Sequence, residues 1–402
     1  MTQPAPSVLV APKDALPVVV RRLGWVAFFT DAAGEMIYPL LPAFLVSLGA
    51  GAAALGWVEG IAEATSAVVK VVAGRLSDRA AARKPFVVAG YAIATLVRPL
   101  LALVVAPWQV VVVRTTDRIG KGLRSGPRDA LVANVVPASG RGLAYGYHQM
   151  MDNLGAVLGP TLAFVLARGA GFSPRAIFAC AIFPGLLAVA TLVFGVKEAP
   201  HAARVEPKGS ADARTAPALA SPVKTYLVVV AVFTLGASAD SFLLLRMLDL
   251  GLPVAFAPLV WLTLNASKAA TNMPGGRLSD RMGRRKTLAL AWVVYAAAYA
   301  LFPMTHSVAV TWVLIAGYGV YYGLAEGGEK AILADLAPKE QRGRAFGLLH
   351  AVTGAAVLPA NALFGLLYGS SPAYAFGVSA GFAFVAAVLL VALPARSPPG
   401  FR

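Results

Sequence analysis

A charged stretch occurs twice in this chain, each time between two apolar runs. Residues Gly74–Lys84 read GRLSDRAAARK, and residues Gly276–Lys286 read GRLSDRMGRRK. The second copy starts 202 positions after the first (276 − 74), which is about half of a chain of 402 residues. A repeat at this spacing predicts two related halves, each of which crosses a membrane several times.

A second internal match supports the duplication. In both halves a five-residue segment begins with alanine and ends with proline, and an Arg-Gly pair follows a few residues later. The two copies are Ala133–Pro137 with Arg141 and Gly142, and Ala334–Pro338 with Arg342 and Gly343. The spacing is 201 positions (334 − 133), close to that of the charged stretches. Both halves therefore share one order of apolar and charged segments.

Composition identifies the class of protein. The chain is 58% hydrophobic and 13% charged, whereas soluble domains carry about 25% charged residues. We therefore predict an all-α polytopic membrane protein. Since a span needs about 20 residues, the length accommodates twelve transmembrane helices in two pseudo-symmetric six-helix bundles. The single cysteine, Cys180, excludes an internal disulfide and a cysteine metal site.

Polar segments mark the predicted divisions of the chain. A stretch near the middle is rich in alanine, proline and charge and has no apolar periodicity, which is typical of a linker. The predicted divisions are a cytoplasmic N-terminal tail at 1–22, an N-terminal bundle at 23–196, a cytoplasmic linker at 197–223, a C-terminal bundle at 224–393 and a C-terminal tail at 394–402.

The formal net charge of +16 would suggest a nucleic-acid partner in a soluble protein. In a membrane protein it instead indicates arginine and lysine in the cytoplasmic loops. Basic residues gather in the two repeated stretches and the linker, whereas the loops at 49–55, 305–307 and 370–371 contain none; Arg168 and Arg175 are exceptions. We therefore expect both termini in the cytoplasm and no nucleic-acid partner.

The repeated stretch resembles the G-x-L-x-D-R-x-G-R-R/K signature that follows the second and eighth helices of major facilitator superfamily transporters. Gly276–Lys286 matches it fully, and Gly74–Lys84 departs from it at Ala81. The resemblance implies an efflux-type transporter of the bacterial inner membrane with a cytoplasmic gate. The residues assigned to this gate are Gly74, Asp78, Arg79, Gly276, Asp280 and Arg281. We also expect the aspartates to bond free amides at a helix end. The alternative is that the basic residues only determine topology.

Many charged residues fall within the predicted spans. A charge at the bilayer centre costs about 2.5–3.5 kcal/mol on insertion scales, so such residues face a polar cavity or one another. The candidates for a substrate cavity and for proton coupling are Asp31, Glu35, Glu59, Glu63, Arg114, Asp117, Arg118, Lys121, Asp240, Glu326 and Glu329. The alternative is a set of structural ion pairs that lock the first, second and fourth helices together.

Asp31 and Glu35 lie one turn apart on one face of the first helix. The resemblance implies that the first, fourth, seventh and tenth helices line the transport path. We expect one of these carboxylates to carry the proton, with Arg114 and Arg118 of the fourth helix as cationic neighbours. The alternative is a permanent salt bridge that never titrates.

Gly155, Gly159 and Pro160 resemble the G-x-x-x-G-P motif of antiporters in the same superfamily. Small residues at this spacing equally allow two helices to pack closely. His148, near two methionines and Asp152, raises the alternative of a soft metal site, although a lone histidine at a helix start more often has a structural role. With no zinc-type spacing in the sequence, we expect no resident metal.

Together these features predict secondary active transport of a small solute or ion by alternating access, driven by protons and directed outward. The sequence contains no Walker loop, nucleotide fingerprint or catalytic triad, so we expect no enzyme activity, no cofactor and no ATP-driven pumping. The expected partners are the solute, protons and the lipid bilayer, and we expect a monomer. Three alternatives stay open: a divalent metal-cation exporter, an organic-anion carrier, and a non-transporting receptor or scaffold with the same fold.

Overall fold

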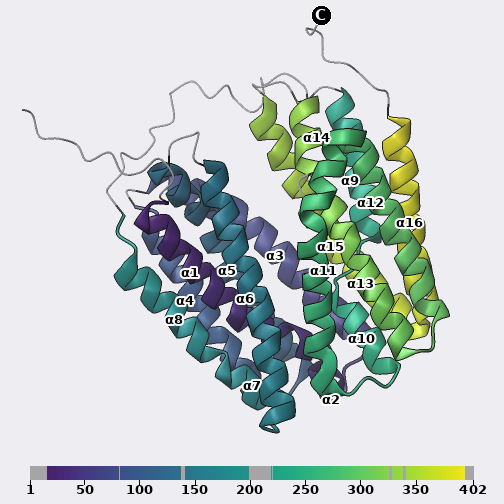
Figure 1. Cartoon of the computed structure of the whole chain (residues 1–402), viewed down its shortest axis with the longest axis horizontal. Coiled ribbons are helices and arrows are strands. Elements are labelled where there is room, and N and C mark those ends of the chain that lie inside the picture. The colour runs from purple at the N-terminus through teal and green to yellow at the C-terminus, as the bar shows by residue number, and fades with distance from the viewer. Residues whose placement is uncertain are drawn as a thin grey trace, which may run out of the picture.

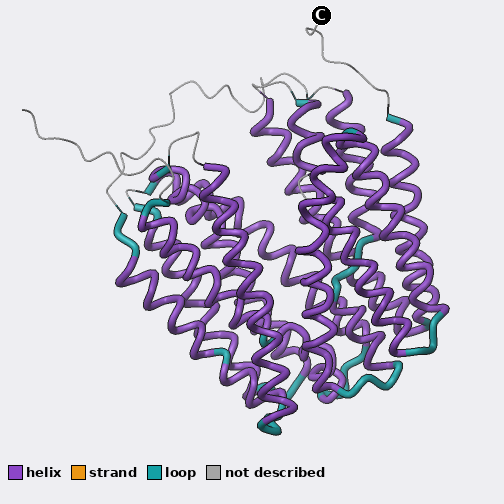
Figure 2. Tube along the Cα trace, viewed as in Figure 1, coloured by secondary structure: helices purple, strands orange, loops and turns teal. Residues whose placement is uncertain are grey.

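The structure, a computed structural model, describes residues 16–80, 82–136, 141–198, 219, 221–325, 328–337 and 341–393. Within these ranges the chain consists of helices and short connections, with no strand (Figure 2). The predicted all-α fold is therefore confirmed.

In the described part of the N-terminal half there are ten helical segments, of which two are 3-10 helices labelled η. Their bounds are α1 (Val18–Glu35), η1 (Tyr38–Leu40), α2 (Leu41–Ser47), α3 (Ala52–Arg79), α4 (Lys84–Val97), η2 (Arg98–Leu103), α5 (Pro107–Val135), α6 (Arg141–Gly169), α7 (Pro174–Cys180) and α8 (Ile182–Gly195). The first helix begins five residues earlier than the tail boundary expected from sequence (23 − 18).

The C-terminal half repeats this organisation. Its bounds are α9 (Ser221–Gly236), α10 (Ser241–Asp249), η4 (Val254–Phe256), α11 (Ala257–Met282), α12 (Arg284–Leu301), η5 (Phe302–Met304), α13 (Val308–Ala325), α14 (Gly328–Leu336), α15 (Arg342–Ser370) and α16 (Pro372–Ala392). Most of the predicted linker, and all of the predicted C-terminal tail, lie outside the described residues.

Eight segments in the described part of the chain are long and apolar enough to cross a membrane by length and composition alone. Four further spans fall short of this criterion. They are the interrupted pair α1 and α2, and the helices α3, α5 and α11, which carry charged residues along their length. The two sets together give the twelve spans expected from the sequence.

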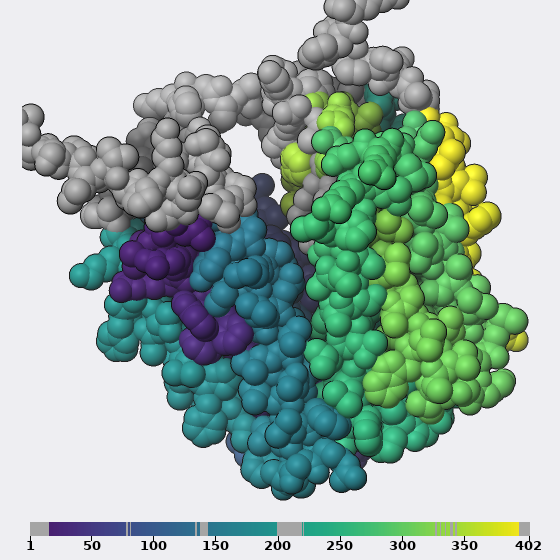
Figure 3. All heavy atoms as spheres, in the orientation of Figure 1, coloured from purple at the N-terminus to yellow at the C-terminus, as the bar shows by residue number. Residues whose placement is uncertain are grey.

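The two halves form separate bundles that meet at one end and diverge at the other (Figure 1). The bundles contact each other through α3 with α15, α6 with α11 and α2 with α10. The space-filling view shows the halves touching at the bottom and separated by a gap at the top (Figure 3). The end of α16 lies at this open end (Figure 1).

Glycines let the two halves approach closely where α3 crosses α15. A Cβ at Gly365 would lie 2.6 Å from the carbonyl oxygen of Ala52, and one at Gly60 would lie 2.9 Å from Cδ1 of Leu358. Neither distance is possible between real atoms, so a larger residue would push the helices apart. Small residues at such crossings are typical of membrane helix packing.

The first and seventh spans are both interrupted. Pro39 lies in η1, between α1 and α2, as the bend predicted from the prolines requires. In the seventh span the helix stops at Gly236 and resumes at Ser241. The free amide of Ala239 in this break donates to the side-chain oxygen of Asn361 at 2.7 Å. Each break brings a backbone segment of its half to the central boundary.

The two repeated charged stretches, which lie between apolar runs in the sequence, are mostly helical in the structure. The helix α3 continues to Arg79 and α11 continues to Met282, so the connections comprise only residues 80–83 and Gly283. Gly283 has φ +87°, a conformation that favours glycine.

The amides at the start of α4 are capped by a residue from elsewhere in the half. The carboxylate of Glu198, after the end of α8, accepts hydrogen bonds from the amides of Arg83 at 2.9 Å and Lys84 at 2.7 Å. These two amides therefore have a partner other than the signature aspartate, and the expected cap by that aspartate stays a prediction. The side chain of Asp78 lies outside the described part, and Asp280 makes no side-chain hydrogen bond within it.

The second half ties its repeated stretch to its last helix in a different way. The guanidinium of Arg285 donates to the carbonyl oxygens of Leu390 and Val391, each at 2.6 Å. These carbonyls belong to the last turn of α16, where backbone acceptors have no partner within the helix. In both halves the charged stretch is thus fixed to the end of the sixth span.

Candidate functional site

A cavity of about 630 Å³ lies between the two halves and is lined mainly by charged and polar side chains. A second cavity of about 1150 Å³ adjoins it and shares Asn265 and Lys268 of α11 with it. The charged residues that line the first cavity are Asp31, Glu35, Glu63, Lys70, Arg98, Arg114, Asp117, Arg118, Lys121, Arg124, Arg128, Asp129, Asp152, Asp240 and Lys268.

Helix α5 supplies most of the cationic side chains. Its charged residues recur at alternating spacings of three and four, which places them on one face of the helix. The residues on this face are Arg114, Asp117, Lys121, Arg124 and Arg128. The stripe therefore forms one wall of the cavity along several turns.

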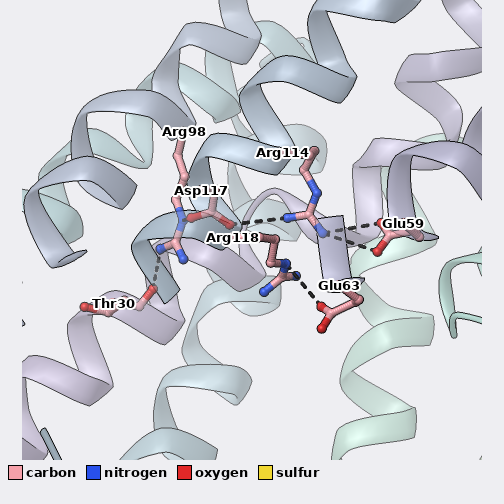
Figure 4. A network of polar contacts seen from close by, with 7 residues as sticks. All are labelled: Thr30, Glu59, Glu63, Arg98, Arg114, Asp117 and Arg118. Carbon is pink, nitrogen blue, oxygen red and sulfur yellow. Dashed lines mark hydrogen bonds and ion pairs between the residues drawn. The ribbon is translucent and has the colours of Figure 1, made fainter. Parts of the chain in front are cut away.

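Asp117 lies at the centre of a buried ion-pair network (Figure 4). Its carboxylate oxygens lie 2.9 Å from Nε of Arg98 and 3.6 Å from Nη1 of Arg114. Arg114 also reaches Glu59 at 3.3 Å, and Arg98 donates to the backbone carbonyl of Thr30 at 2.8 Å. The network joins α1, α3, η2 and α5, and it pairs charges that would otherwise be buried at a high cost.

A second pair lies one turn along the same helices. Nε of Arg118 is 3.2 Å from a carboxylate oxygen of Glu63 (Figure 4). The Glu63 side chain is 38% exposed, so this pair faces the cavity. In this conformation the predicted charges of the second and fourth spans are largely paired with each other, and their part in coupling stays a prediction.

Asp31 and Glu35, the two carboxylates of the first span, do not pair with the cations expected from the sequence. Arg114 pairs instead with Glu59 and Asp117, and Arg118 pairs with Glu63. Asp31 lines the cavity, and no cation lies within 4.0 Å of it among the described residues. Glu35 accepts a hydrogen bond from the indole of Trp261 on α11.

In the C-terminal half the charges centre on Asp240, at the break between α9 and α10. Its carboxylate lies 2.9 Å from Nζ of Lys268 and accepts hydrogen bonds from Tyr318 at 2.8 Å and Tyr322 at 2.9 Å. Lys268 also lies 3.7 Å from the ring centroid of Tyr322. The predicted site residue Asp240 is therefore in the cavity wall with three donors on one carboxylate.

The tenth span is only partly described. Glu329, a predicted site residue, lines the adjoining cavity. Glu326, the other predicted residue of this span, lies outside the described residues. The first cavity therefore has a charged N-terminal wall and a C-terminal wall that contains Asp240, Lys268 and aromatic or amide side chains.

Sequence reasoning missed several residues of the site. Arg98 and Lys268 are intramembrane cations, so the rule that selected Arg114 also applied to them. Trp261 and Tyr38 are different, because aromatic residues are common in apolar helices and nothing in the sequence pairs them with the cavity. Only the packing of α11 against η1 brings these two rings together.

Comparison with known proteins places both halves in one family. Residues 23–266 and 247–402 match the model of the Major Facilitator Superfamily. The chain belongs to the Major Facilitator Superfamily. As a member of this superfamily it is a multi-pass membrane protein that transports a small solute, and it is not an enzyme.

Three known proteins illustrate the similarity. The MFS-type transporter MJ1317 of Methanocaldococcus jannaschii is 31% identical over 378 residues, covering 92% of this chain and 94% of the relative. The quinolone resistance protein NorA of Staphylococcus aureus is 22% identical over 152 residues, covering 37% and 39%. A crystal structure of a peptide transporter POT in complex with sulfate superimposes with a TM-score of 0.75 at 16% identity, covering 95% of each chain, which shows the shared fold.

The antiporter-like glycines of this superfamily member pack against the first helix. A Cβ at Gly155 would collide with the carbonyl oxygen of Phe28, and one at Gly159 would lie 2.5 Å from that of Ala32. Close packing of α6 on α1 therefore requires glycine at both positions. Pro160 follows within α6, and a specific role of the motif in antiport stays a prediction.

Five of the six residues assigned to the gate have described side-chain positions, and these five lie in open or exposed surroundings in this conformation. A Cβ at Gly74 or Gly276 would meet no atom within 4 Å. Arg79, Asp280 and Arg281 are exposed. This fits a molecule whose halves are separated at that end, and the gate itself stays a prediction.

His148 has a local partner. Its Nδ1 lies 3.2 Å from a carboxylate oxygen of Asp152, one turn further along α6. Among the residues that the structure describes, no group of three or more histidine, cysteine, aspartate or glutamate side chains converges in a way that could hold a metal ion.

Proposed function

We propose that this protein is a proton-coupled secondary transporter that exports a small polar solute across the bacterial inner membrane by alternating access. This proposal rests mainly on the charged cavity between the halves, where the two carboxylates of the first span, Asp31 and Glu35, have no cation within 4.0 Å in the described part of the chain. Of the two, Glu35 accepts a hydrogen bond from the indole of Trp261, which leaves Asp31 as the first candidate. Such a group can bind a proton while the cavity opens to one side and release it on the other side.

The other cavity carboxylates support this assignment by contrast. Glu63, Asp117 and Asp240 each have a cation within 3.2 Å. A carboxylate held by a cation stays ionised, so it takes up a proton less readily than an unpaired one. Glu35 is the second candidate, because its hydrogen bond comes from the opposite half and changes when the halves move.

The orientation follows from the distribution of basic residues. The open end of the molecule carries both repeated charged stretches, and arginine and lysine favour the cytoplasmic side. We therefore propose that both termini are cytoplasmic and that this conformation opens inward. We also propose that a single chain forms the complete path, because both walls of the cavity come from it.

Two features favour export over import. The first is the similarity over 152 residues to NorA, a quinolone resistance protein. The second is the Gly155–Pro160 segment, which resembles the antiporter motif. An antiporter that uses the inward proton gradient moves its solute outward, so both features favour export.

The alternatives predicted from sequence have less support. A metal-cation exporter would use carboxylates of the first and second spans with His148, and both carboxylates of the second span, Glu59 and Glu63, are paired with arginines. A receptor or scaffold needs no polar cavity that both halves line. The organic-anion carrier is favoured by a separate observation: Lys121 and Arg124 line the cavity and have no carboxylate within 4.0 Å in the described part of the chain.

The experiment is a flux assay on purified protein in proteoliposomes that contain a pH-sensitive dye. A panel of solutes is added with and without an imposed pH gradient. The proposal predicts that at least one solute causes protein-dependent proton movement. Solute entry without any proton movement would contradict coupling, and no movement of any solute in well-folded protein would favour the scaffold.

A further inference from the structure

Two neighbouring cations on α5 have no carboxylate partner. Lys121 and Arg124 both line the cavity, and no acidic oxygen lies within 4.0 Å of either among the described residues. Most of the other arginines and lysines around them are neutralised, including Arg98, Arg114 and Lys268. Lys121 and Arg124 are therefore two adjacent cations of the cavity wall that have no carboxylate at ion-pair distance in the described part of the chain.

Arg124 is the more constrained of the two. Its side chain packs over the ring of Tyr91, with 4.6 Å from the guanidinium carbon to the ring centroid. The residue is 6% exposed, and its Nη1 has no hydrogen-bond acceptor among the described residues. A buried donor without an acceptor is costly, so this unused nitrogen in a cavity wall indicates a missing acceptor.

The spacing of the pair strengthens this argument. Lys121 and Arg124 are three residues apart on one helical face, where like charges repel each other. The next charge along the stripe, Arg128, avoids the problem because Asp129 lies 3.0 Å from it. An anion between Lys121 and Arg124 would remove the repulsion and supply the acceptor.

The opposite wall offers neutral hydrogen-bonding groups. Asn265 of α11 lines both cavities, and Asn272 lines the adjoining one. The amide nitrogen of Asn265 and the amide oxygen of Asn272 are buried without a partner in the described structure. One donor and one acceptor on a single face suit hydroxyl or amide groups.

We propose that the transported solute is a small organic anion. Its carboxylate or phosphate binds Lys121 and Arg124, and its hydroxyl or amide groups meet Asn265 and Asn272. The inference rests on the transport function proposed above and names its class of solute. Arg118 and Arg114, one and two turns before Lys121 on α5, are less suited to bind an anion, because Glu59, Glu63 and Asp117 already neutralise them.

The test is thermal unfolding of the purified full-length protein in detergent with matched pairs of solutes. Glucose 6-phosphate is compared with glucose, gluconate with sorbitol, and inorganic phosphate is added alone. The lipophilic cation tetraphenylphosphonium probes the opposite charge. The anionic member of at least one pair should raise the unfolding temperature, and its neutral counterpart should not. The phosphate and carboxylate pairs show which of the two anionic groups the site prefers.

Substitutions then locate the site. Lys121→Gln and Arg124→Gln should each weaken the affinity for the stabilising anion by about 10-fold or more, because each removes a charged hydrogen-bond donor. Arg128→Gln is the matched control, since it removes the same charge from the same helix where Asp129 already balances it, and it should change affinity little. If Arg124→Gln does not fold, Arg124→Lys and Lys121→Gln carry the test, and Arg124→Lys should retain more affinity than a neutral variant.

Several results would overturn the proposal. They are equal stabilisation by neutral and anionic members of every pair, no stabilisation by any anion at millimolar concentration, and unchanged anion affinity in both neutral variants. Stabilisation by tetraphenylphosphonium that is lost in Asp31→Asn would show a cation site instead. Binding is measured without a membrane, so the two proposals can fail separately. Anion binding without flux in liposomes would contradict the transport function and leave the anion site standing. Proton-coupled flux of only neutral or cationic solutes would contradict the anion site and leave the transport function standing.

Discussion

The indole nitrogen of Trp261, in the C-terminal half, donates a hydrogen bond to the carboxylate of Glu35, in the N-terminal half. Beside it, the ring centroids of Trp261 and Tyr38 lie 4.6 Å apart. Both contacts join α11 to the first span at the boundary of the cavity. Alternating access requires that contacts between the halves on the closed side break when that side opens.

Trp261→Phe should therefore favour the opposite, outward-open conformation. The change keeps an aromatic ring but removes a hydrogen bond to a charged group, which stabilises by about 1.5–3 kcal/mol. That is a shift in the conformational equilibrium of about 10-fold or more. Arg75 and Arg277 are exposed residues near the open ends of α3 and α11. Spin labels at these two positions should show a larger population at short inter-label distance, because these ends approach each other in the outward-open conformation.

Trp312→Phe is the matched control for this variant. The indole of Trp312 donates to the hydroxyl of Thr263 at 2.9 Å, within the C-terminal half. Its loss should leave the distance distribution between the labels unchanged. If both tryptophan variants shift the distribution equally, the contact between Trp261 and Glu35 is not a specific latch.

The buried pair of Arg98 and Asp117 should be essential for stability. Arg98→Met removes the partner 2.9 Å from Asp117 and exposes the carbonyl of Thr30 to an apolar side chain. Breaking a buried pair on one side destabilises by about 3–5 kcal/mol. Unfolding in detergent measures the loss.

An exposed pair provides the comparison for that measurement. Arg284 and Asp335 lie 2.7 Å apart, and both side chains are more than half exposed. Arg284→Met should lower stability by no more than about 1 kcal/mol. Equal losses in Arg98→Met and Arg284→Met would mean that the central network contributes no more than a surface contact.

The gate assignment predicts a kinetic effect. Asp78→Asn and Asp280→Asn should leave folding and membrane insertion largely intact and slow transport, because the signature stretches would close the cytoplasmic side less well. Initial transport rates in proteoliposomes, normalised to the amount of inserted protein, measure the effect. A full transport rate in both variants would show that these aspartates do not form a gate.

Labelling of single cysteines tests the orientation. In a Cys180→Ser background, Met282→Cys lies at the end of α11 on the charge-rich side, and Ser307→Cys lies in the loop before α13 on the other side. A membrane-impermeant maleimide added to intact cells should label only Ser307→Cys. Labelling of Met282→Cys alone would reverse the proposed topology.

Much of the fold could be predicted from the sequence because its signals are local. The repeat of Gly74–Lys84 at Gly276–Lys286 fixed the two halves, and apolar length located most spans. The extent of helix was less predictable. The segment Gly74–Arg79 looks like a polar loop by composition, but in the structure it continues α3 as a helix. Helix α5 carries charged residues from Arg114 to Asp129, so hydropathy alone does not identify it as a span.

The site was predictable by residue type and not by pairing. Intramembrane charge selected Asp31, Asp117 and Asp240, and the structure places all three in the lining of the cavity. The sequence could not show that Arg98 pairs with Asp117, because their spacing of 19 residues (117 − 98) gives no periodic relation between two different helices. The contact of Trp261 with Glu35 depends on how the two halves dock, which no local pattern reports.

Asp31 is the residue that we propose couples proton movement to solute movement through the cavity. Two assays on Asp31→Asn in proteoliposomes test this role, both with the anion that gives the largest thermal stabilisation. The first assay measures gradient-driven accumulation of the labelled anion, and the second measures its exchange at equal concentrations without a gradient. Glu35→Gln is measured in parallel as the second candidate. We expect Asp31→Asn to lose accumulation and to retain exchange. If Asp31→Asn accumulates the anion at the wild-type level, Asp31 does not carry the proton.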